Sequence, residues 1–325
     1  MKSLVTGGAG FIGSHLVESL LNQGDEVVVL DNFSTGRKQN LTKIIDKLDL
    51  VEVDVSSSGE WDKYFNGVSR VFHLAALADI VPSIEDPESY YNANVNGTFN
   101  VMQASKEYNV AKVIYSASSS CYGIPDIFPT PETADIRPQY PYALTKYLGE
   151  QIVLHWSKVY KVPSISARFF NVYGPRSRTS GTYGAVFGVF LAQKLNNKPF
   201  TVVGDGTQTR DFTYVTDIVD ALLLASESKL DNEVINLGSD NTYSVNNLAE
   251  LLEGEKIYIP KRPGEPDCTW ADISKAKDLL NWQPKITLQE GVKKLLDNLD
   301  YWKDAPVWDE ESISVATKKW FDYLS

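Results

Sequence analysis

The sequence predicts an α/β protein, a doubly wound parallel sheet followed by a smaller α/β domain. Short strands rich in β-branched residues alternate with helical stretches, a glycine-rich turn follows the first strand, and this rhythm ends near residue 170. Such alternation is typical of parallel strands joined by crossover helices. We expect a first domain over residues 1–170, to which a segment near 208–237 returns, and a second over residues 171–325.

Five short apolar segments are the expected strands of the first domain, at 3–5, 27–30, 51–53, 70–74 and 112–115. Apolar residues at helical spacing predict crossover helices over 12–21 and 90–108. Beyond residue 170 we expect isolated strands at 234–237 and 257–259. The last twenty residues are rich in Trp and Asp and carry no motif of evident chemistry.

Composition and charge exclude several classes of protein. The 325 residues are 43% hydrophobic and 22% charged, as in globular proteins, and 31 basic against 42 acidic residues give a net charge of −11. That charge argues against nucleic-acid binding. Glycines interrupt the apolar N-terminus and no apolar run reaches the roughly 18 residues of a membrane helix, so we expect neither secretion nor membrane insertion. Two cysteines, Cys121 and Cys268, favour the reducing cytoplasm.

A glycine-rich turn lies between the first strand and the first helix. Gly7, Gly10 and Gly13 are spaced three apart, and the turn also contains Phe11 and Ile12. Glycine permits positive φ and close approach of the backbone to an anion, while the helix N-terminus supplies partial positive charge. A strand before the turn, a helix after it and an acidic residue ending the second strand favour dinucleotide binding over a turn whose glycines serve packing alone.

Asp31 ends the second predicted strand, where its carboxylate can accept both ribose hydroxyls of an adenosine. A 2′-phosphate would meet that negative charge, so NAD is favoured over NADP, although Arg37 nearby could attract the phosphate. Asp54 is placed to hold an adenine, or is an ordinary loop acid. The other residues assigned to the cofactor here are Asn32, Val55, Leu74, Ala75 and Ala76.

A tyrosine and a lysine follow Pro141 at helical spacing. Tyr142 and Lys146 share one helix face, and an ammonium group beside a phenol would lower the tyrosine pKa toward that of a general base. Tyr108 and Lys112 have the same spacing, but they join the end of a helix to the start of a strand and do not share a face.

Small polar residues follow the strand at 112–115, and ligands of open parallel sheets bind beside such strand ends. Ser118 is placed to bridge a substrate oxygen and the phenol of Tyr142. Serine is also common in plain turns, so this assignment depends on the glycine turn and on the Tyr–Lys pair.

Together these motifs resemble the extended short-chain dehydrogenase/reductase superfamily, and within it the UDP-galactose and UDP-N-acetylglucosamine 4-epimerases. Other segments carry the same resemblance: 92–98 with Asn94, 168–175, 204–206, 210–212, 262–264 and 271–276. The resemblance implies a Rossmann-type fold, NAD as cofactor, a UDP-sugar substrate and a homodimer formed by helices near 88–108 and 142–159.

The resemblance also implies site residues. Ser118, Tyr142 and Lys146 would be catalytic: Tyr142 would take the proton from the sugar 4-hydroxyl as hydride passes to NAD, and a 4-keto sugar would rotate and be reduced on its other face. Lys146 would hold the nicotinamide ribose, and Asn94 would bind the cofactor. The implied substrate-binding residues are Ser118, Ser119, Ser120, Tyr142, Asn171, Arg210, Arg262 and Thr269.

Related reactions remain open. Dehydratases that resemble this chain carry an Asp–Glu pair after the Ser118 position, and decarboxylases usually keep the glutamate, whereas this chain has Ser119 and Ser120. Simple epimerisation is therefore favoured over UDP-glucuronate decarboxylation or 4,6-dehydration. A UDP-glucuronate epimerase, or a protein that binds NAD without catalysis, is the remaining alternative.

Thr269 matches a family position where a bulky tyrosine restricts the pocket to glucose and galactose. A small residue there predicts that UDP-GlcNAc and UDP-GalNAc are accepted too. The alignment is irregular at residues 266–268, so Cys268 or Trp270 could occupy the position instead, and Trp270 would reverse the prediction. No metal is expected, because His15, His73 and His155 have no second ligand at metal spacing.

Overall fold

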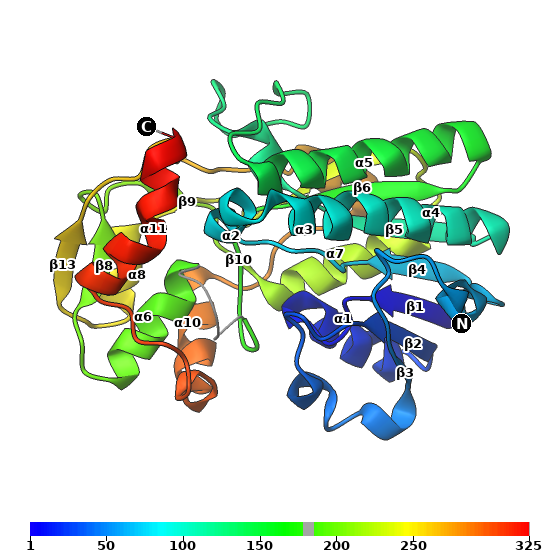
Figure 1. Ribbon diagram of the computed structural model, residues 1–325, viewed down its shortest axis with the longest axis horizontal. Helices are drawn as coiled ribbons and strands as arrows, with labels where there is room; N and C mark the ends of the chain where they lie inside the picture. Colours follow the sequence, from blue (N-terminus) through cyan, green and yellow to red (C-terminus); the bar gives the residue numbers. More distant parts are fainter. Residues whose placement is uncertain (178–184, 325) are drawn as a thin grey trace.

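The computed structural model describes residues 1–177 and 185–324 (Figure 1). Seven parallel strands form one sheet in the order β11-β6-β5-β4-β1-β2-β3. They are β1 (Lys2–Thr6), β2 (Glu26–Asp31), β3 (Asp49–Glu52), β4 (Arg70–His73), β5 (Lys112–Ser118), β6 (Ser164–Phe169) and β11 (Glu233–Leu237). The strand order reverses between β1 and β4, which is where open parallel sheets bind their ligands.

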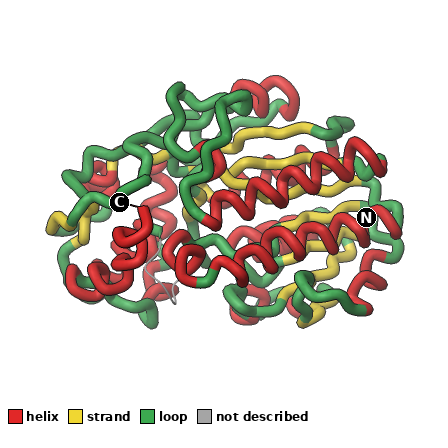
Figure 2. Tube along the Cα trace, turned by 45° about the horizontal axis from the view of Figure 1, so that its top comes forward, coloured by secondary structure: helices red, strands yellow, loops and turns green. Residues whose placement is uncertain are grey.

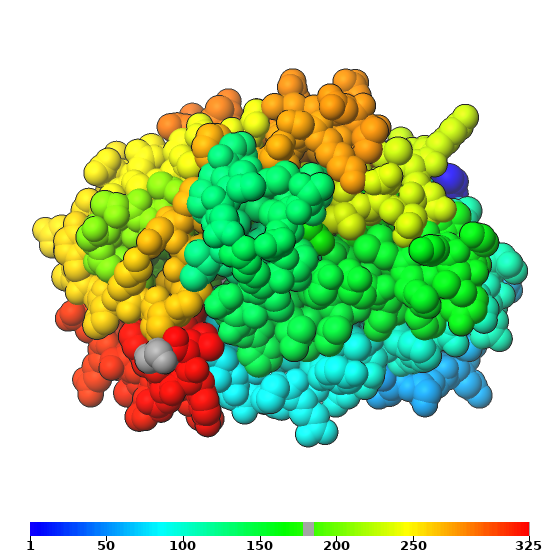
Figure 3. All heavy atoms as spheres, turned by 90° about the horizontal axis from the view of Figure 1, so that it is seen from above, coloured from blue at the N-terminus to red at the C-terminus, as the bar shows by residue number. Residues whose placement is uncertain are grey.

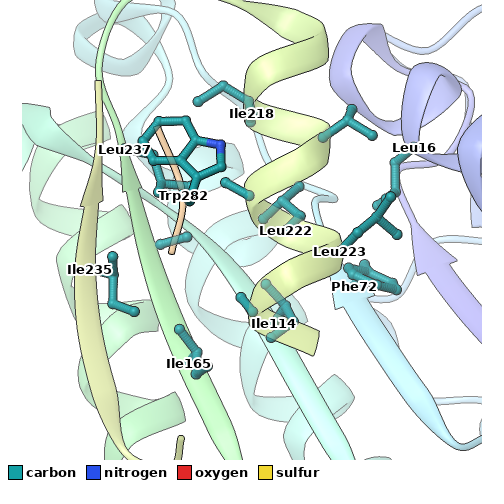
Figure 4. Packing of buried hydrophobic residues seen from close by; sticks show 14 of the residues in the cluster. Leu16, Phe72, Ile114, Ile165, Ile218, Leu222, Leu223, Ile235, Leu237 and Trp282 are labelled. Atoms are coloured by element: carbon teal, nitrogen blue, oxygen red, sulfur yellow. The ribbon is translucent and has the colours of Figure 1, made fainter. Parts of the chain in front are cut away.

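Helices cover both faces of the sheet (Figures 1 and 2). One face carries α1 (Phe11–Asn22) and α7 (Val215–Glu227), whose apolar side chains form a core with the strands (Figure 4). The other face carries α3 (Pro87–Tyr91), α4 (Gly97–Glu107) and α5 (Pro141–Tyr160). A π-helical turn, Asn92–Asn96, joins α3 to α4.

The remaining elements form a smaller region with its own core. The part of it that the structure describes has three two-stranded sheets: β8 (Phe200–Val203) with β13 (Lys256–Ile259), β7 (Val172–Tyr173) with β10 (Thr213–Tyr214), and β9 (Thr209–Arg210) with β12 (Tyr243–Ser244). The other helices of the described chain are α2 (Ile80–Glu85), α6 (Val186–Leu195), α8 (Val245–Leu251), α9 (Ser274–Leu280), α10 (Leu288–Leu296) and α11 (Glu310–Leu324).

The predicted fold class is confirmed, with two corrections. Strand β5 continues to Ser118, so that serine ends the strand instead of lying in a loop beyond it. Residues 234–237 are not an isolated strand, because β11 pairs with β6 at the edge of the large sheet. Strand β11 also contacts α9, and hydrophobic pattern alone does not specify which strand it pairs with. Within residues 1–177 and 185–324, no helix is long and apolar enough to span a bilayer.

Candidate active site

A cavity of about 380 Å³ lies at the carboxyl ends of β1, β2, β4 and β5. Its volume lies in the range of small-molecule and cofactor sites. The N-terminus of α1 lines one end, and Tyr142 and Lys146 of α5 line the wall near β5. The predicted cofactor residues that line it are Gly7, Gly10, Phe11, Ile12, Gly13, Asp31, Asn32, Asp54, Val55, Leu74, Ala75, Ala76, Tyr142 and Lys146.

The glycine turn leaves no room for side chains. Gly7 has φ +71°, and a Cβ there would lie 2.7 Å from the backbone nitrogen of Ala75. A Cβ at Gly13 would overlap the carbonyl oxygen of Gly7. Only glycine therefore lets the chain turn from β1 into α1 with its amides close to the cavity. This cradle fits the diphosphate of a dinucleotide at a helix N-terminus.

Asp31 is buried at the end of β2 and held by two backbone amides. Its carboxylate accepts hydrogen bonds from the nitrogens of Ala9 at 2.9 Å and Phe33 at 2.8 Å. Burial raises its pKa above the ordinary value. Each oxygen keeps a lone pair for a ribose hydroxyl, because a carboxylate offers about four acceptor positions. Arg37 also lines the cavity, with its guanidinium 5.8 Å from the ring centre of Tyr301.

Asn94 stands apart from the other predicted cofactor residues, because it does not line the cavity. Its amide is buried in the π-helical turn, where Nδ2 donates to the carbonyl of Leu77 and to Thr145 Oγ1, both at 3.0 Å. Its Oδ1 accepts from the nitrogen of Leu77 at 2.8 Å. Asn94 therefore ties α5 to the cavity loop that contains Leu77.

Tyr142 lines the cavity, and Ser118 ends β5 nearby. Burial raises the pKa of Tyr142, while the side chain of Ser118 acts in the opposite direction. The ring of Tyr140 stacks on that of Tyr142, with centroids 6.4 Å apart and an interplanar angle of 7°.

Lys146 lies one helical turn beyond Tyr142. Its ammonium group is 4.5 Å from the ring centre of Tyr115, and burial lowers its pKa to about 7. The expectation that Lys146 lowers the Tyr142 pKa is wrong for this structure. Desolvation dominates both groups, because it disfavours the phenolate and the ammonium ion alike.

Two arginines lie close to the same carboxylate, that of Glu265. Arg210 on β9 and Arg262 in the loop after β13 each lie 3.6 Å from Glu265, and their side chains are only 12% and 13% exposed. Both Arg210 and Glu265 act electrostatically on Tyr140. Arg210 thus lies near Tyr140, and two guanidinium groups gathered around one carboxylate are an arrangement that could bind a diphosphate.

The remaining predicted substrate residues lie around this cluster. Thr269 Oγ1 donates to Asn171 Oδ1 at 2.8 Å and accepts from the nitrogen of Asp211 at 3.2 Å, so the threonine side chain faces Asn171. Ser119 and Ser120 belong to a short 3₁₀ turn after β5. Burial raises the pKa of Tyr140, and the side chain of Ser120 acts against this rise.

Sequence analysis missed Tyr140, Glu265 and Tyr301. Tyr140 and Glu265 directly neighbour the Pro-Tyr and Arg-Pro-Gly motifs, and this proximity could have singled them out. No motif near Tyr301 indicated a role for it. Its side chain lines the cofactor cavity, and its hydroxyl donates to Asn40 Oδ1 at 3.1 Å, although the two residues are 261 positions apart in the sequence. Among residues 1–177 and 185–324, no group of three His, Cys, Asp or Glu side chains could hold a metal ion.

Comparison with known proteins agrees with this geometry. The sequence profile of the NAD dependent epimerase/dehydratase family matches residues 3–238, which include the glycine turn, Ser118, Tyr142 and Lys146. The chain belongs to this family. The resemblance to extended short-chain dehydrogenases/reductases is therefore confirmed, and NAD is the cofactor that the cavity is built to hold.

Three relatives show how closely the chain matches the family. A putative UDP-glucose 4-epimerase of Methanocaldococcus jannaschii is 37% identical over 90% of this chain and 97% of its own. The UDP-glucuronic acid 4-epimerase of Bacillus cereus, solved with UDP-glucuronic acid and NAD, has a TM-score of 0.86 and 34% identity over 94% and 99% of the two chains. The UDP-N-acetylglucosamine 4-epimerase of Methanobrevibacter ruminantium, solved with UDP-N-acetylmuramic acid, has a TM-score of 0.85 and 33% identity over 91% and 98%.

Proposed function

We propose that this protein is an NAD-dependent 4-epimerase of UDP-hexoses. The observation that carries the proposal is the position of Tyr142 and Lys146 in the wall of the cofactor cavity, with Ser118 acting on Tyr142 and two arginines available for a diphosphate. When bound, NAD supplies the acceptor and later the donor of the C4 hydride.

The residues of the chain account for the rest of the reaction. Tyr142 acts as the phenolate, which takes the proton from the 4-hydroxyl as C4 is oxidised and so becomes the phenol. The phenol returns this proton when the 4-keto group is reduced on its other face. Ser118 holds the sugar oxygen against the phenol. Arg210 and Arg262 bind the diphosphate, so the keto sugar can rotate about its anomeric linkage without leaving the enzyme.

The substrate range follows from the side chains near the sugar. Thr269 is small and its hydroxyl is engaged with Asn171, which favours space for an N-acetyl group at C2. We propose that UDP-GlcNAc and UDP-GalNAc are interconverted as well as UDP-Glc and UDP-Gal. Ser119 and Ser120 provide no acid–base pair for dehydration at C5 and C6.

A homodimer and a cytoplasmic location complete the proposal. Helices α3 to α5 expose Tyr91, Phe99, Leu144, Val159 and Tyr160, each at least 40% accessible. Burying these side chains against a second copy would stabilise a dimer. Both cysteines are free, in keeping with a reducing compartment. Light scattering of a Phe99→Glu variant tests the dimer, because a charge in that face is expected to give monomers.

A proton NMR assay tests the proposed reaction. UDP-Glc, UDP-GlcNAc and UDP-glucuronic acid are incubated separately with the purified protein, without added NAD, and their anomeric signals are followed. We expect the 4-epimers of UDP-Glc and UDP-GlcNAc. Turnover of UDP-glucuronic acid alone would replace the proposed substrate with the one bound in the Bacillus cereus structure. A 4-keto-6-deoxy product, or no reaction after NAD is added, would contradict epimerisation.

A further inference from the structure

Trp320 lies near the end of α11, in the segment for which the sequence offered no chemistry. Its side chain is 2% exposed, and its indole nitrogen donates to the carbonyl of Pro263 at 2.8 Å. The guanidinium of Arg262 lies over its ring, 5.2 Å from the centroid. The indole therefore contacts both the side chain of Arg262 and the backbone of the next residue.

The same indole also lies beside Tyr140, the neighbour of the proposed general base Tyr142. Its ring lies 6.4 Å from that of Tyr140, at an angle of 55°. Tyr140 in turn stacks on Tyr142. Only one aromatic ring thus separates Trp320 from the general base.

Helix α11 joins the two regions of the molecule. It packs against α2 of the first domain, where Lys319 lies 3.8 Å from Glu85 (Figures 1 and 3). Towards its N-terminus, Ile313 is 3% exposed and belongs to the core of the second domain. Trp320 is therefore held from two sides while it contacts Arg262 and Tyr140.

Arg262 has a competing partner in Glu265. A guanidinium drawn to that carboxylate is less available to a diphosphate, and the aromatic face of Trp320 opposes this by attracting the cation without neutralising it. A ring fixed by its own hydrogen bond also limits the rotamers that Arg262 can adopt.

We propose that α11 is a wall of the nucleotide-sugar site and that Trp320 is a positioning residue, which holds Arg262 toward the diphosphate and Tyr140 against Tyr142. This inference rests on the proposed function, because that function assigns Arg262 to the diphosphate. The last segment of the chain, which contains no recognisable motif, would thereby have a role in substrate binding.

Three variants of the full chain test it: Trp320→Leu, Trp320→Phe and, as a matched control, Ile313→Ala in the same helix. Calorimetry measures UDP binding, assays with UDP-glucose give KM and kcat, and absorbance after acid release gives the NAD content. Trp320→Leu removes the aromatic face, so we expect UDP affinity to fall about tenfold and KM to rise about as much. NAD content should not change, and kcat should change less than KM.

The other two variants separate positioning from stability. Trp320→Phe keeps an aromatic ring but loses the N–H group, so we expect it to restore UDP affinity to within about threefold of the wild type. Ile313→Ala leaves a cavity in the core and should lower Tm while UDP affinity stays within about twofold.

The outcomes distinguish this proposal from the proposed function. Trp320→Leu protein that binds UDP as tightly as the wild type would overturn the role of Trp320 alone. So would an Ile313→Ala protein with equally weakened UDP binding, because the effect would then be general destabilisation. Wild-type protein that binds none of UDP, dTDP and GDP would overturn the proposed function together with this inference.

Discussion

The cofactor half and the sugar half of the candidate site are built by different means. The cofactor cavity is shaped largely by backbone and small residues at strand ends, such as the turn from Gly7 to Gly13 and the loop after β4. The proposed sugar half consists of long side chains, among them Arg210, Arg262 and Trp320, which come from a short strand, a loop and the last helix. The first kind of site tolerates little change in the backbone, while the second depends on how side chains hold one another.

The largest effect on activity is expected from Tyr142, which lies between the cofactor half and the sugar half. Tyr142→Phe removes the group that exchanges the proton, and general acid–base residues contribute about 10²–10⁴ in rate. We expect epimerase kcat to fall about 1,000-fold while the protein still purifies with NAD. Tyr108→Phe, in the pair with the same spacing away from the cavity, is the control and should retain full activity. Unchanged kcat in Tyr142→Phe would show that another group is the base.

A pair of glycine variants tests the cofactor half. Gly7 and Gly67 have nearly the same φ, +71° and +72°, but a Cβ at Gly7 meets the backbone of Ala75 whereas Gly67 faces open space. Gly67→Ala should cost about 1 kcal/mol in unfolding free energy, from backbone strain alone. Gly7→Ala should cost at least about 3 kcal/mol and lose bound NAD. Equal losses of Tm, with NAD retained in both, would mean that the tight turn does not shape the cofactor site.

Variants in the proposed sugar half should bind UDP less tightly but should keep their bound NAD. Arg210→Met or Arg262→Met removes a charged hydrogen-bond donor, so UDP affinity should fall about 10- to 50-fold. Arg137→Met is the matched control, since this arginine is 43% exposed and pairs with surface carboxylates. Titration calorimetry with UDP measures the effect. If all three variants bound UDP equally well, the diphosphate would have to lie elsewhere.

The smallest expected effect is a change in Tm, because burying the ammonium group of Lys146 lowers the stability of the folded protein. Its folded pKa is lowered to about 7, whereas an unfolded lysine titrates near 10.4. Between these values the unfolded chain binds more protons, so stability rises with pH and the cost of burial is largest below pH 7. Lys146→Met should therefore raise Tm by about 2 °C or more at pH 7, and by less at pH 10. If the rise in Tm were the same at pH 7 and pH 10, the buried charge of Lys146 would not be its cause.

The sequence located most of the strands and residues that the structure brings together around the cavity. Each strand before residue 120 was located within a few residues, and of the predicted cofactor residues only Asn94 lies behind the cavity wall. The reason is that glycine spacing and strand-end acids report local backbone geometry. Tyr301 was missed because nothing near it in the chain indicates that it reaches the cofactor cavity.

Local sequence was enough to predict the fold class, the glycine turn, the place of Asp31 and the shared helix face of Tyr142 and Lys146, because each depends on residues close together along the chain. The other features depend on contacts between distant segments. Tertiary structure placed β11 beside β6, turned Thr269 toward Asn171, and brought Trp320 to Arg262 and Tyr140. It also reversed the expected pKa of Tyr142, because burial depends on everything packed around a group, and spacing along the chain does not report it.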